Sequence, residues 1–230
     1  WGANANVSID VDDSSELASN VPNREPFGSF LMYLMVGTRP DIAFAVSRMA
    51  KYVESLTILQ WKAVKHIMRY IRHTSDYGLE FGGSGNVDFK CFCDSDWGGD
   101  TATRKSTSGY IFCMAGGAVS WSSKKQAVVA LSSTESEYVG LSLAAKEAVW
   151  LRRLVGGIGI SEIYNGEPVT IFADNQGSIK LAENDSTSKR TKHIDIRYHF
   201  TKNVILSGEI VLEYCSTTLQ RHFIIFYDNI

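Results

Sequence analysis

The spacing of apolar residues changes once along this chain, at the glycine-rich segment 82–86. Before that segment, apolar residues recur at helical spacing in three runs, near 28–38, 42–53 and 58–72, and Arg39-Pro40 separates the first two. After it, residues 87–93 alternate polar and apolar side chains, which is typical of a half-buried strand. We therefore predict a flexible polar leader (1–24), a small helical segment (25–81), a linker (82–86) and a sheet-containing domain that begins at residue 87.

The order of elements after the linker predicts an α/β fold. Two strands are expected around a glycine-rich turn, and then a long helix with one apolar stripe. A strand, two helices and a last strand follow, so that the expected elements lie at 87–93, 109–114, 118–121, 134–155, 169–173, 175–183, 192–206 and 210–214. This order suits a mixed sheet with helices packed on its faces.

Charge and cysteine usage narrow the functional classes. The net charge of −2 gives no global support for nucleic-acid binding, so any such binding must depend on local basic patches. Cys91 and Cys93 have a single residue between them, which is not zinc or redox spacing, and on a strand both would face the core. Buried free cysteines favour a reducing compartment.

Membrane and secretory signals are not visible in the sequence. No run approaches the ~20 consecutive apolar residues of a membrane-spanning helix. The first twenty residues lack a basic start followed by an apolar core, so no signal peptide is expected. The chain begins with Trp1, which is consistent with a piece cut from a longer protein.

Three acids occupy positions that favour chemistry. Asp94 directly follows the apolar strand 87–93, and Asp174 directly follows the apolar strand 169–173. Strand ends of α/β sheets are where catalytic groups collect. Glu137 lies four residues before Leu141 on the apolar stripe of the long helix, where a carboxylate is costly unless it is neutralised.

Each acid also has a structural interpretation. Strand-end aspartates form turns, and a glutamate in a first helical turn can act as a cap. Glu135 makes a capping-box spacing with Ser132, so Glu137 is the better candidate for chemistry. Asp96 is a rival for Asp94, because both could face the same way. Converging carboxylates repel unless a cation lies between them, and such oxygen ligands suit Mg²⁺ or Mn²⁺.

Several words of sequence resemble one known family. They are Asp-Ser-Asp-Trp-Gly-Gly-Asp at 94–100, Arg-Lys-Ser-Thr-Ser-Gly-Tyr at 104–110, Ser-Trp-Ser-Ser-Lys-Lys-Gln at 120–126, Ser-Ser-Thr-Glu-Ser-Glu-Tyr at 132–138, Ala-Asp-Asn-Gln at 173–176 and Arg-Thr-Lys-His-Ile-Asp-Ile-Arg-Tyr-His-Phe at 190–200. From about 87 to 220 the chain closely resembles the ribonuclease H domain of copia-type retrotransposon Pol polyproteins. Residues 22–81 resemble the segment that joins reverse transcriptase to ribonuclease H in that family.

The resemblance implies a ribonuclease H-like mixed sheet with flanking helices, preceded by a small helical segment. It also implies hydrolysis of the RNA strand of RNA–DNA hybrids with two Mg²⁺ ions, and it places the first three metal-binding acids on Asp94, Glu137 and Asp174. Asn175 and Gln176 are similar to residues that touch the hybrid near its sugars. The implied partner is the reverse transcriptase of the same polyprotein, and the expected location is a cytoplasmic virus-like particle or the nucleus.

The tail departs from the family pattern. In the family the last strand leads into Gln-Leu-Ala-Asp-Ile-Phe-Thr-Lys, whose Asp is the fourth acid of the metal site. Here Gln220 agrees, but Phe223 takes the place of that Asp, and Asp228 is out of register. The abrupt change over 221–230 is typical of a frameshifted or truncated copy. We therefore expect an impaired nuclease, and the alternative is a decayed relic that binds nucleic acid without turnover.

Basic residues supply candidate contacts to phosphates. Arg104-Lys105 forms one cluster, and a second runs along 189–202 and includes Lys192. The competing interpretation is a solvated basic face. A third role has less support: Arg69-Tyr70-Ile71-Arg72 is near the Arg-x-Leu-Arg word of secreted pathogen effectors, but no signal peptide accompanies it.

Overall fold

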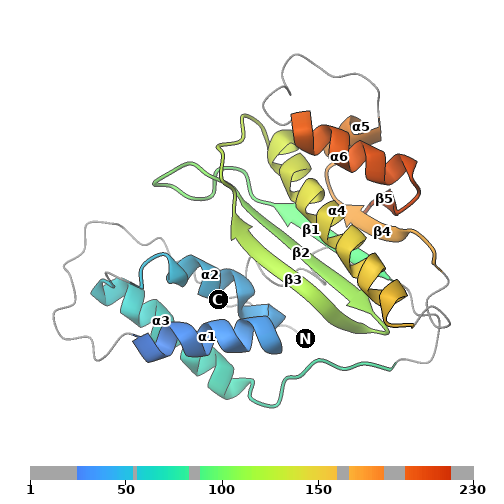
Figure 1. Ribbon diagram of the computed structural model, residues 1–230. Coiled ribbons are helices and arrows are strands. Elements are labelled where there is room, and N and C mark those ends of the chain that lie inside the picture. The colour runs from blue at the N-terminus through green and yellow to red at the C-terminus, as the bar shows by residue number, and fades with distance from the viewer. Residues whose placement is uncertain (1–24, 54–55, 83–88, 160–165, 184–194, 219–230) are drawn as a thin grey trace. The chain divides into compact units, whose positions relative to one another are not determined.

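The computed structural model describes residues 25–53, 56–82, 89–159, 166–183 and 195–218. Within them the chain separates into a helical unit that ends at Leu79 and a sheet-centred unit that begins at Glu80 (Figure 1). The predicted leader (1–24), the linker residues 83–86 and the divergent tail (221–230) lie outside the described residues.

The helical unit has its own apolar core. It contains α1 (Glu25–Gly37), a 3-10 helix η1 (Pro40–Ile42), α2 (Ala43–Ala50) and α3 (Ile58–His73). Pro40 opens η1 as predicted, because proline fits the first position of a helix. Thr57 starts α3 with a capping box: its hydroxyl accepts from the Gln60 amide at 3.3 Å, and the Gln60 side chain accepts from the Thr57 amide at 2.8 Å.

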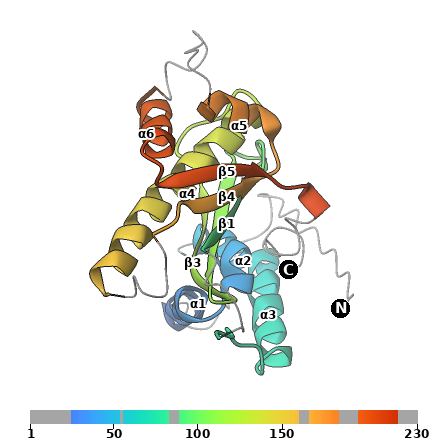
Figure 2. The ribbon, with the colours of Figure 1, turned by 90° about the vertical axis from the view of Figure 1, so that its right-hand side faces the viewer.

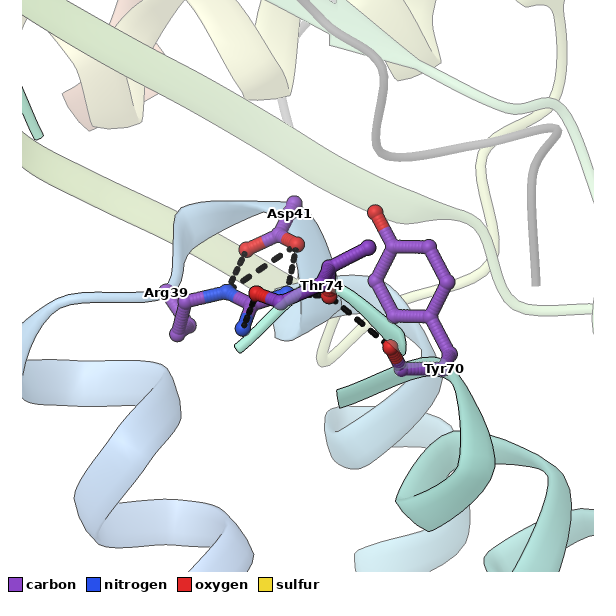
Figure 3. Close-up of polar contacts among 4 residues, drawn as sticks. All are labelled: Arg39, Asp41, Tyr70 and Thr74. Carbon is purple, nitrogen blue, oxygen red and sulfur yellow. Dashed lines mark hydrogen bonds and ion pairs between the residues drawn. The ribbon is translucent and has the colours of Figure 1, made fainter. Parts of the chain in front are cut away.

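Arg39 ties the connection between α1 and η1 to the end of α3 (Figure 3). The Arg39 guanidinium donates from Nε and Nη2 to the Asp41 carboxylate, at 2.9 and 2.6 Å. It also donates to the Thr74 carbonyl at 3.1 Å and to the Thr74 hydroxyl at 2.6 Å, just beyond the end of α3. The Tyr70 ring lies 5.7 Å from the guanidinium carbon, and burial raises the pKa of Tyr70 to about 12. Arg39, which separates two of the predicted helices, therefore has a structural role.

The second unit is built on a five-stranded mixed sheet. Its strands are β1 (Lys90–Ser95), β2 (Thr107–Met114), β3 (Gly117–Lys125), β4 (Val169–Ala173) and β5 (Ile210–Tyr214), in the order β3-β2-β1-β4-β5. β1, β2 and β3 pair antiparallel, whereas β4 runs parallel to β1 and β5 parallel to β4. The β2–β3 turn has positive φ at Ala115 and Gly116, as two-residue hairpin turns require.

Three helices complete this unit: α4 (Ser133–Gly157), α5 (Gln176–Glu183) and α6 (Asp195–Leu206). α4 lies along one face of the sheet with α6 beside it on the same side, and α5 packs against both helices (Figures 1 and 2). Cys91 and Cys93 belong to the core under α4, whereas Phe92 on the same strand stacks on Phe172 instead, with ring centroids 5.1 Å apart.

The predicted fold class is confirmed, with differences at the ends of elements. β3 continues to Lys125, four residues beyond its predicted end, because the polar residues 122–125 pair with β2 at the edge of the sheet. Gly82, predicted as linker, has φ 104° and donates its amide to the Ala115 carbonyl at 3.0 Å, so it belongs to the sheet unit. No helix of the described residues is long and apolar enough to cross a membrane.

Candidate active site

The three predicted acids lie together at one edge of the sheet. Asp94 is near the carboxyl end of β1, and Asp174 directly follows β4. β1 and β4 are parallel neighbours, so these ends meet at the same edge. Glu137 comes from the second turn of α4 above them. One ligand atom from each carboxylate lies within 4.8 Å of the others, a spacing that a single cation can bridge.

The head of α4 determines which glutamate faces the sheet. The Ser132 hydroxyl accepts from the Glu135 amide at 3.2 Å and so caps the helix. The Glu135 carboxylate accepts from the Leu131 amide at 3.0 Å, which fixes the entry of the chain into α4. The predicted capping box is therefore only half formed, because the Glu135 carboxylate accepts from Leu131 and not from the Ser132 amide. Glu135 still has a structural role, and Glu137, two residues later, faces the strand ends.

The pairing of β1 with β2 determines which of Asp94 and Asp96 faces the other two acids. Asp96 lies just beyond β1, and its carboxylate accepts from the Thr107 amide at 2.6 Å. Among the described residues, the group of acids close enough together to hold one metal ion contains Asp94 and not Asp96. Asp96 therefore holds the β1–β2 connection, and Asp94 faces the other two acids.

Burial and mutual repulsion disfavour ionisation of these acids. Burial and, after it, the charges of Asp94 and Asp174 together raise the pKa of Glu137 to about 9. The pKa of Asp94 is raised first by burial and then by the charge of Asp174. A cation among the carboxylates would remove both penalties. The donor set is oxygen alone and anionic, so the residues fit a hard divalent metal ion.

The segment after β5 reaches the same site. The Thr217 hydroxyl donates to the Asp174 carboxylate at 2.7 Å, and the Cys215 amide donates to the Ala173 carbonyl at 3.0 Å. Thr217 was not predicted as a site residue, because its partner is 43 positions away. Phe223, which the family resemblance aligns with the fourth acid, lies outside the described residues.

A buried polar network supports the site from behind. The Gln126 amide donates to the Ser108 hydroxyl at 2.8 Å and to the Ser136 carbonyl at 3.0 Å. The Ser136 hydroxyl in turn donates to the Asp96 carbonyl at 2.6 Å. These bonds tie the head of α4 to β1 and β2. The only sequence signal for Gln126 was its place at the end of a family word.

Gly140 lets α4 approach the sheet closely. A Cβ on this glycine would overlap the Ser95 hydroxyl, which is itself bonded to Ser108 at 2.9 Å. Gly140 lies three residues after Glu137 on the same helix. The close approach therefore helps to bring the glutamate down to the strand ends.

The predicted substrate-binding residues have different surroundings. Arg104 is exposed in the β1–β2 connection, where Lys105 is half-buried. The Asn175 side-chain oxygen accepts from the Ser178 amide at 2.9 Å, so this residue helps to start α5, and Gln176 beside it is exposed. Lys192 lies outside the described residues.

The strand order, the helices and the three acids together define a ribonuclease H-type domain.

Comparisons with known proteins connect this domain to transposons. The chain is 42% identical over 195 residues to the Nicotiana tabacum "Retrovirus-related Pol polyprotein from transposon TNT 1-94", covering 85% of this chain and 14% of that protein. It is 37% identical over 187 residues to the corresponding polyprotein from transposon RE2 of Arabidopsis thaliana, covering 81% and 13%. It is also 50% identical over 132 residues to "Secreted RxLR effector protein 161" of Plasmopara viticola, covering 57% and 92%.

No protein-family model matches the chain. Among solved structures, it is similar to ribonuclease H1 of Halobacterium salinarum, with a TM-score of 0.41 and 9% identity over 58% of this chain and 89% of that one. A second neighbour is the compost metagenome LC11 ribonuclease H1, with a TM-score of 0.44 and 11% identity over 59% and 89%.

The chain belongs to the copia-type retrotransposon Pol polyprotein family, as its sequence words indicated, and it carries the ribonuclease H domain of that family. It spans 14% and 13% of the length of the two polyproteins.

Proposed function

We propose that this chain hydrolyses the RNA strand of RNA–DNA hybrids at the cluster of Asp94, Glu137 and Asp174, at a rate limited by the absence of a fourth acid. The observation that carries the proposal is the approach of the three carboxylates to within 4.8 Å at neighbouring parallel strand ends. Each acid comes from a different element of the fold. Carboxylates this close repel one another, and such an unfavourable cluster is typical of a functional site.

The same residues would hold the metal, for which we propose Mg²⁺ or, in its place, Mn²⁺. When bound, such an ion activates water and offsets charge on the phosphate that is cleaved. Asp94 and Asp174 offer carboxylates from rigid strand ends. Glu137 offers a third from α4, and Thr217 fixes the orientation of Asp174 through its hydrogen bond.

Residues around the cluster would bind the hybrid. Arg104 and Lys105 carry positive charge in the connection that follows Asp94, where they can pair with phosphates. The oxygen of the Asn175 amide caps α5, so its nitrogen is the group available to a sugar hydroxyl; Gln176 is exposed beside it. A contact to the 2′-hydroxyl would distinguish RNA from DNA. Lys192 remains a predicted contact on sequence grounds.

The test is cleavage of a labelled RNA–DNA hybrid by the full chain in Mg²⁺ and in Mn²⁺, with single-stranded RNA as the comparison. We expect slow cleavage of the hybrid that Asp174→Asn abolishes. Glu213→Gln removes an exposed acid of β5 outside the cluster and should leave the rate unchanged. Equal cleavage by the wild type and by Asp174→Asn would overturn the proposal.

The wider setting is also a proposal. The reverse transcriptase of the same polyprotein would supply hybrids, because DNA synthesis on an RNA template produces them. The site of action would then be a cytoplasmic virus-like particle or the nucleus. Complete absence of turnover, with hybrid binding retained, would favour the relic that binds without cleaving.

A second candidate, a secreted effector, is favoured by one observation: this chain covers 92% of the Plasmopara viticola effector at 50% identity. The word at 69–72 lies within α3, where Tyr70 packs against Arg39. Appearance of the tagged full chain in the medium of expressing cells would support this role. Retention in the cells would argue against it.

A further inference from the structure

One aromatic side chain beside the acid cluster remains in solvent although its polar edge is bound. The Trp97 indole N–H donates to the Ala130 carbonyl at 3.1 Å, and yet 59% of the residue is exposed. The hydrogen bond fixes the ring and leaves its apolar surface open. An exposed indole contributes much less to folding stability than a tryptophan buried in a core, so this apolar surface contributes little to the fold.

Other exposed apolar residues lie close to Trp97 in the loop that holds the indole. Val128, Val129 and Leu131 are within two positions of Ala130, whose carbonyl accepts from the indole, and all three are exposed. Single exposed apolar residues are ordinary, whereas several close to one fixed ring are typical of a contact surface.

These exposed residues border the candidate active site. Trp97 lies three positions after Asp94, so their Cα atoms are at most about 11 Å apart. The loop that carries the other three leads directly into α4, and the Ser136 hydroxyl at its head is bonded to the Asp96 carbonyl at 2.6 Å. A nucleic-acid strand that contacts Trp97 would therefore lie within reach of the acids.

A cation lies beside the residue that follows Trp97. Gly98 has φ +66°, and a Cβ built on it would be 3.8 Å from Nη2 of Arg104, so the guanidinium of the exposed Arg104 lies against Gly98. Arg104 itself has φ 53°, a conformation that is uncommon for any residue except glycine.

The acids of this loop have other partners. The Asp96 carboxylate binds the Thr107 amide, and the Asp100 carboxylate pairs with Lys125 at 2.5 Å. The positive charge of Arg104 is therefore the one that a ligand at the ring would meet first.

We propose that Trp97 and Arg104 form a nucleotide-binding platform, on which the sugar or base face of a nucleotide packs against the indole while its phosphate pairs with the guanidinium. The proposal rests on the proposed hybrid-cleaving function and names the group that holds the bound strand beside the acids. An aromatic face next to a cation is the combination that binds nucleic-acid strands with little dependence on sequence. An apolar protein partner would have no need of the cation.

The test measures binding of the full chain to a labelled RNA–DNA hybrid and to its separated RNA and DNA strands, in EDTA so that cleavage cannot occur. Trp97→Leu should weaken hybrid binding about 5- to 150-fold, the range for loss of one aromatic stack. Trp97→Phe keeps a ring and should stay within about threefold of the wild type. Arg104→Gln should weaken binding and reduce the salt-dependence slope by about one.

Matched controls lie on α4. Trp150 is 55% exposed and Arg153 is exposed on the same helix, so Trp150→Leu and Arg153→Gln remove similar groups away from the acids. We expect both controls to bind as the wild type does. If Trp97→Leu also lowers the affinity for one of the separated strands, that strand is the one that the platform binds. If it lowers the affinity for the hybrid alone, the ring contacts a sugar that only the paired strand presents.

The outcomes separate the two proposals. If the wild type binds the hybrid and Trp97→Leu binds it equally well, the platform is wrong and the proposed function stands. If Trp150→Leu weakens binding as much as Trp97→Leu, the effect is not local and the platform is again wrong. If the wild type binds neither the hybrid nor either strand in EDTA, the platform is wrong, and the cleavage assay in Mg²⁺ decides the proposed function separately.

Discussion

Restoring the fourth acid should restore catalysis. The change replaces residues 221–226, Arg-His-Phe-Ile-Ile-Phe, with Leu-Ala-Asp-Ile-Phe-Thr, so that Asp takes the place of Phe223. Thr217 is already bonded to Asp174, and the six residues from there to position 223 span at most about 20 Å. The restored carboxylate is therefore within reach of the other three acids.

The expected gain follows from how such sites act. An apolar side chain cannot ligate a metal ion, and the loss of one member of a unit that acts together removes most of the rate. We expect the graft to raise kcat/KM for hybrid cleavage at least ~100-fold, which corresponds to about 2.7 kcal/mol of barrier. The assay is initial-rate cleavage of a labelled hybrid in Mg²⁺ by the full chain and by the grafted chain.

A matched graft isolates the carboxylate. Leu-Ala-Asn-Ile-Phe-Thr differs from the active graft by one functional group, and it should leave the rate at the level of the unmodified chain. If the two grafts cleave equally well, the rescue comes from tail packing and not from an acid. If the unmodified chain already matches the Asp graft and Asp94→Asn abolishes its activity, another acid completes the site, and Asp96 and Asp228 are the ones to test.

Three further predictions concern the metal, the acids and the network behind them. Calorimetric titration with Mg²⁺ should give one site and not two equivalent tight sites, because three carboxylates offer too little charge for a second ion, and Asp174→Asn should weaken what binds. In EDTA, the free energy of unfolding should fall as the pH rises from about 4.5 toward 9, because the folded state holds the proton of Glu137, whose pKa is raised to about 9, more tightly than the unfolded state does. Glu137→Gln should flatten that profile in urea denaturation, and an unchanged slope would contradict the assignment. Gln126→Ala should lower the free energy of unfolding by about 1–3 kcal/mol, because buried partners lose their hydrogen bonds, and a change below about 0.5 kcal/mol would show that water replaces them.

The sequence was sufficient to predict the positions of the acids but not their support. Asp174 directly follows β4 as predicted, whereas Asp94 lies inside β1, which continues to Ser95, two residues beyond the predicted strand end. An acid near the end of an apolar strand is a local signal. Glu137 was predicted from helical spacing and from the capping role expected of Glu135, and the family resemblance placed all three acids. These predictions use residues within a few positions of one another, which is the range over which periodicity carries information.

The supporting contacts could not be predicted because they depend on pairing between distant segments. The sequence favoured Asp94 over Asp96 only because Asp94 is closer to the apolar strand and matches the family, and only the pairing of β1 with β2 places the Thr107 amide against Asp96. The bond from Thr217 to Asp174 likewise requires the parallel pairing of β4 with β5. The polar end of β3 was missed because edge strands need no apolar alternation on their outer side.

Loss of the fourth acid should therefore affect catalysis far more than folding. The three remaining carboxylates already oppose one another, as the raised pKa values of Asp94 and Glu137 indicate. A fourth would add repulsion in the metal-free protein, so replacing it with an apolar residue does not weaken the fold through the acids. The core beneath α4 contains none of them and holds the sheet without their help. A copy of this domain can thus lose turnover and keep its structure, and hybrid binding through Trp97 and Arg104 would outlast cleavage.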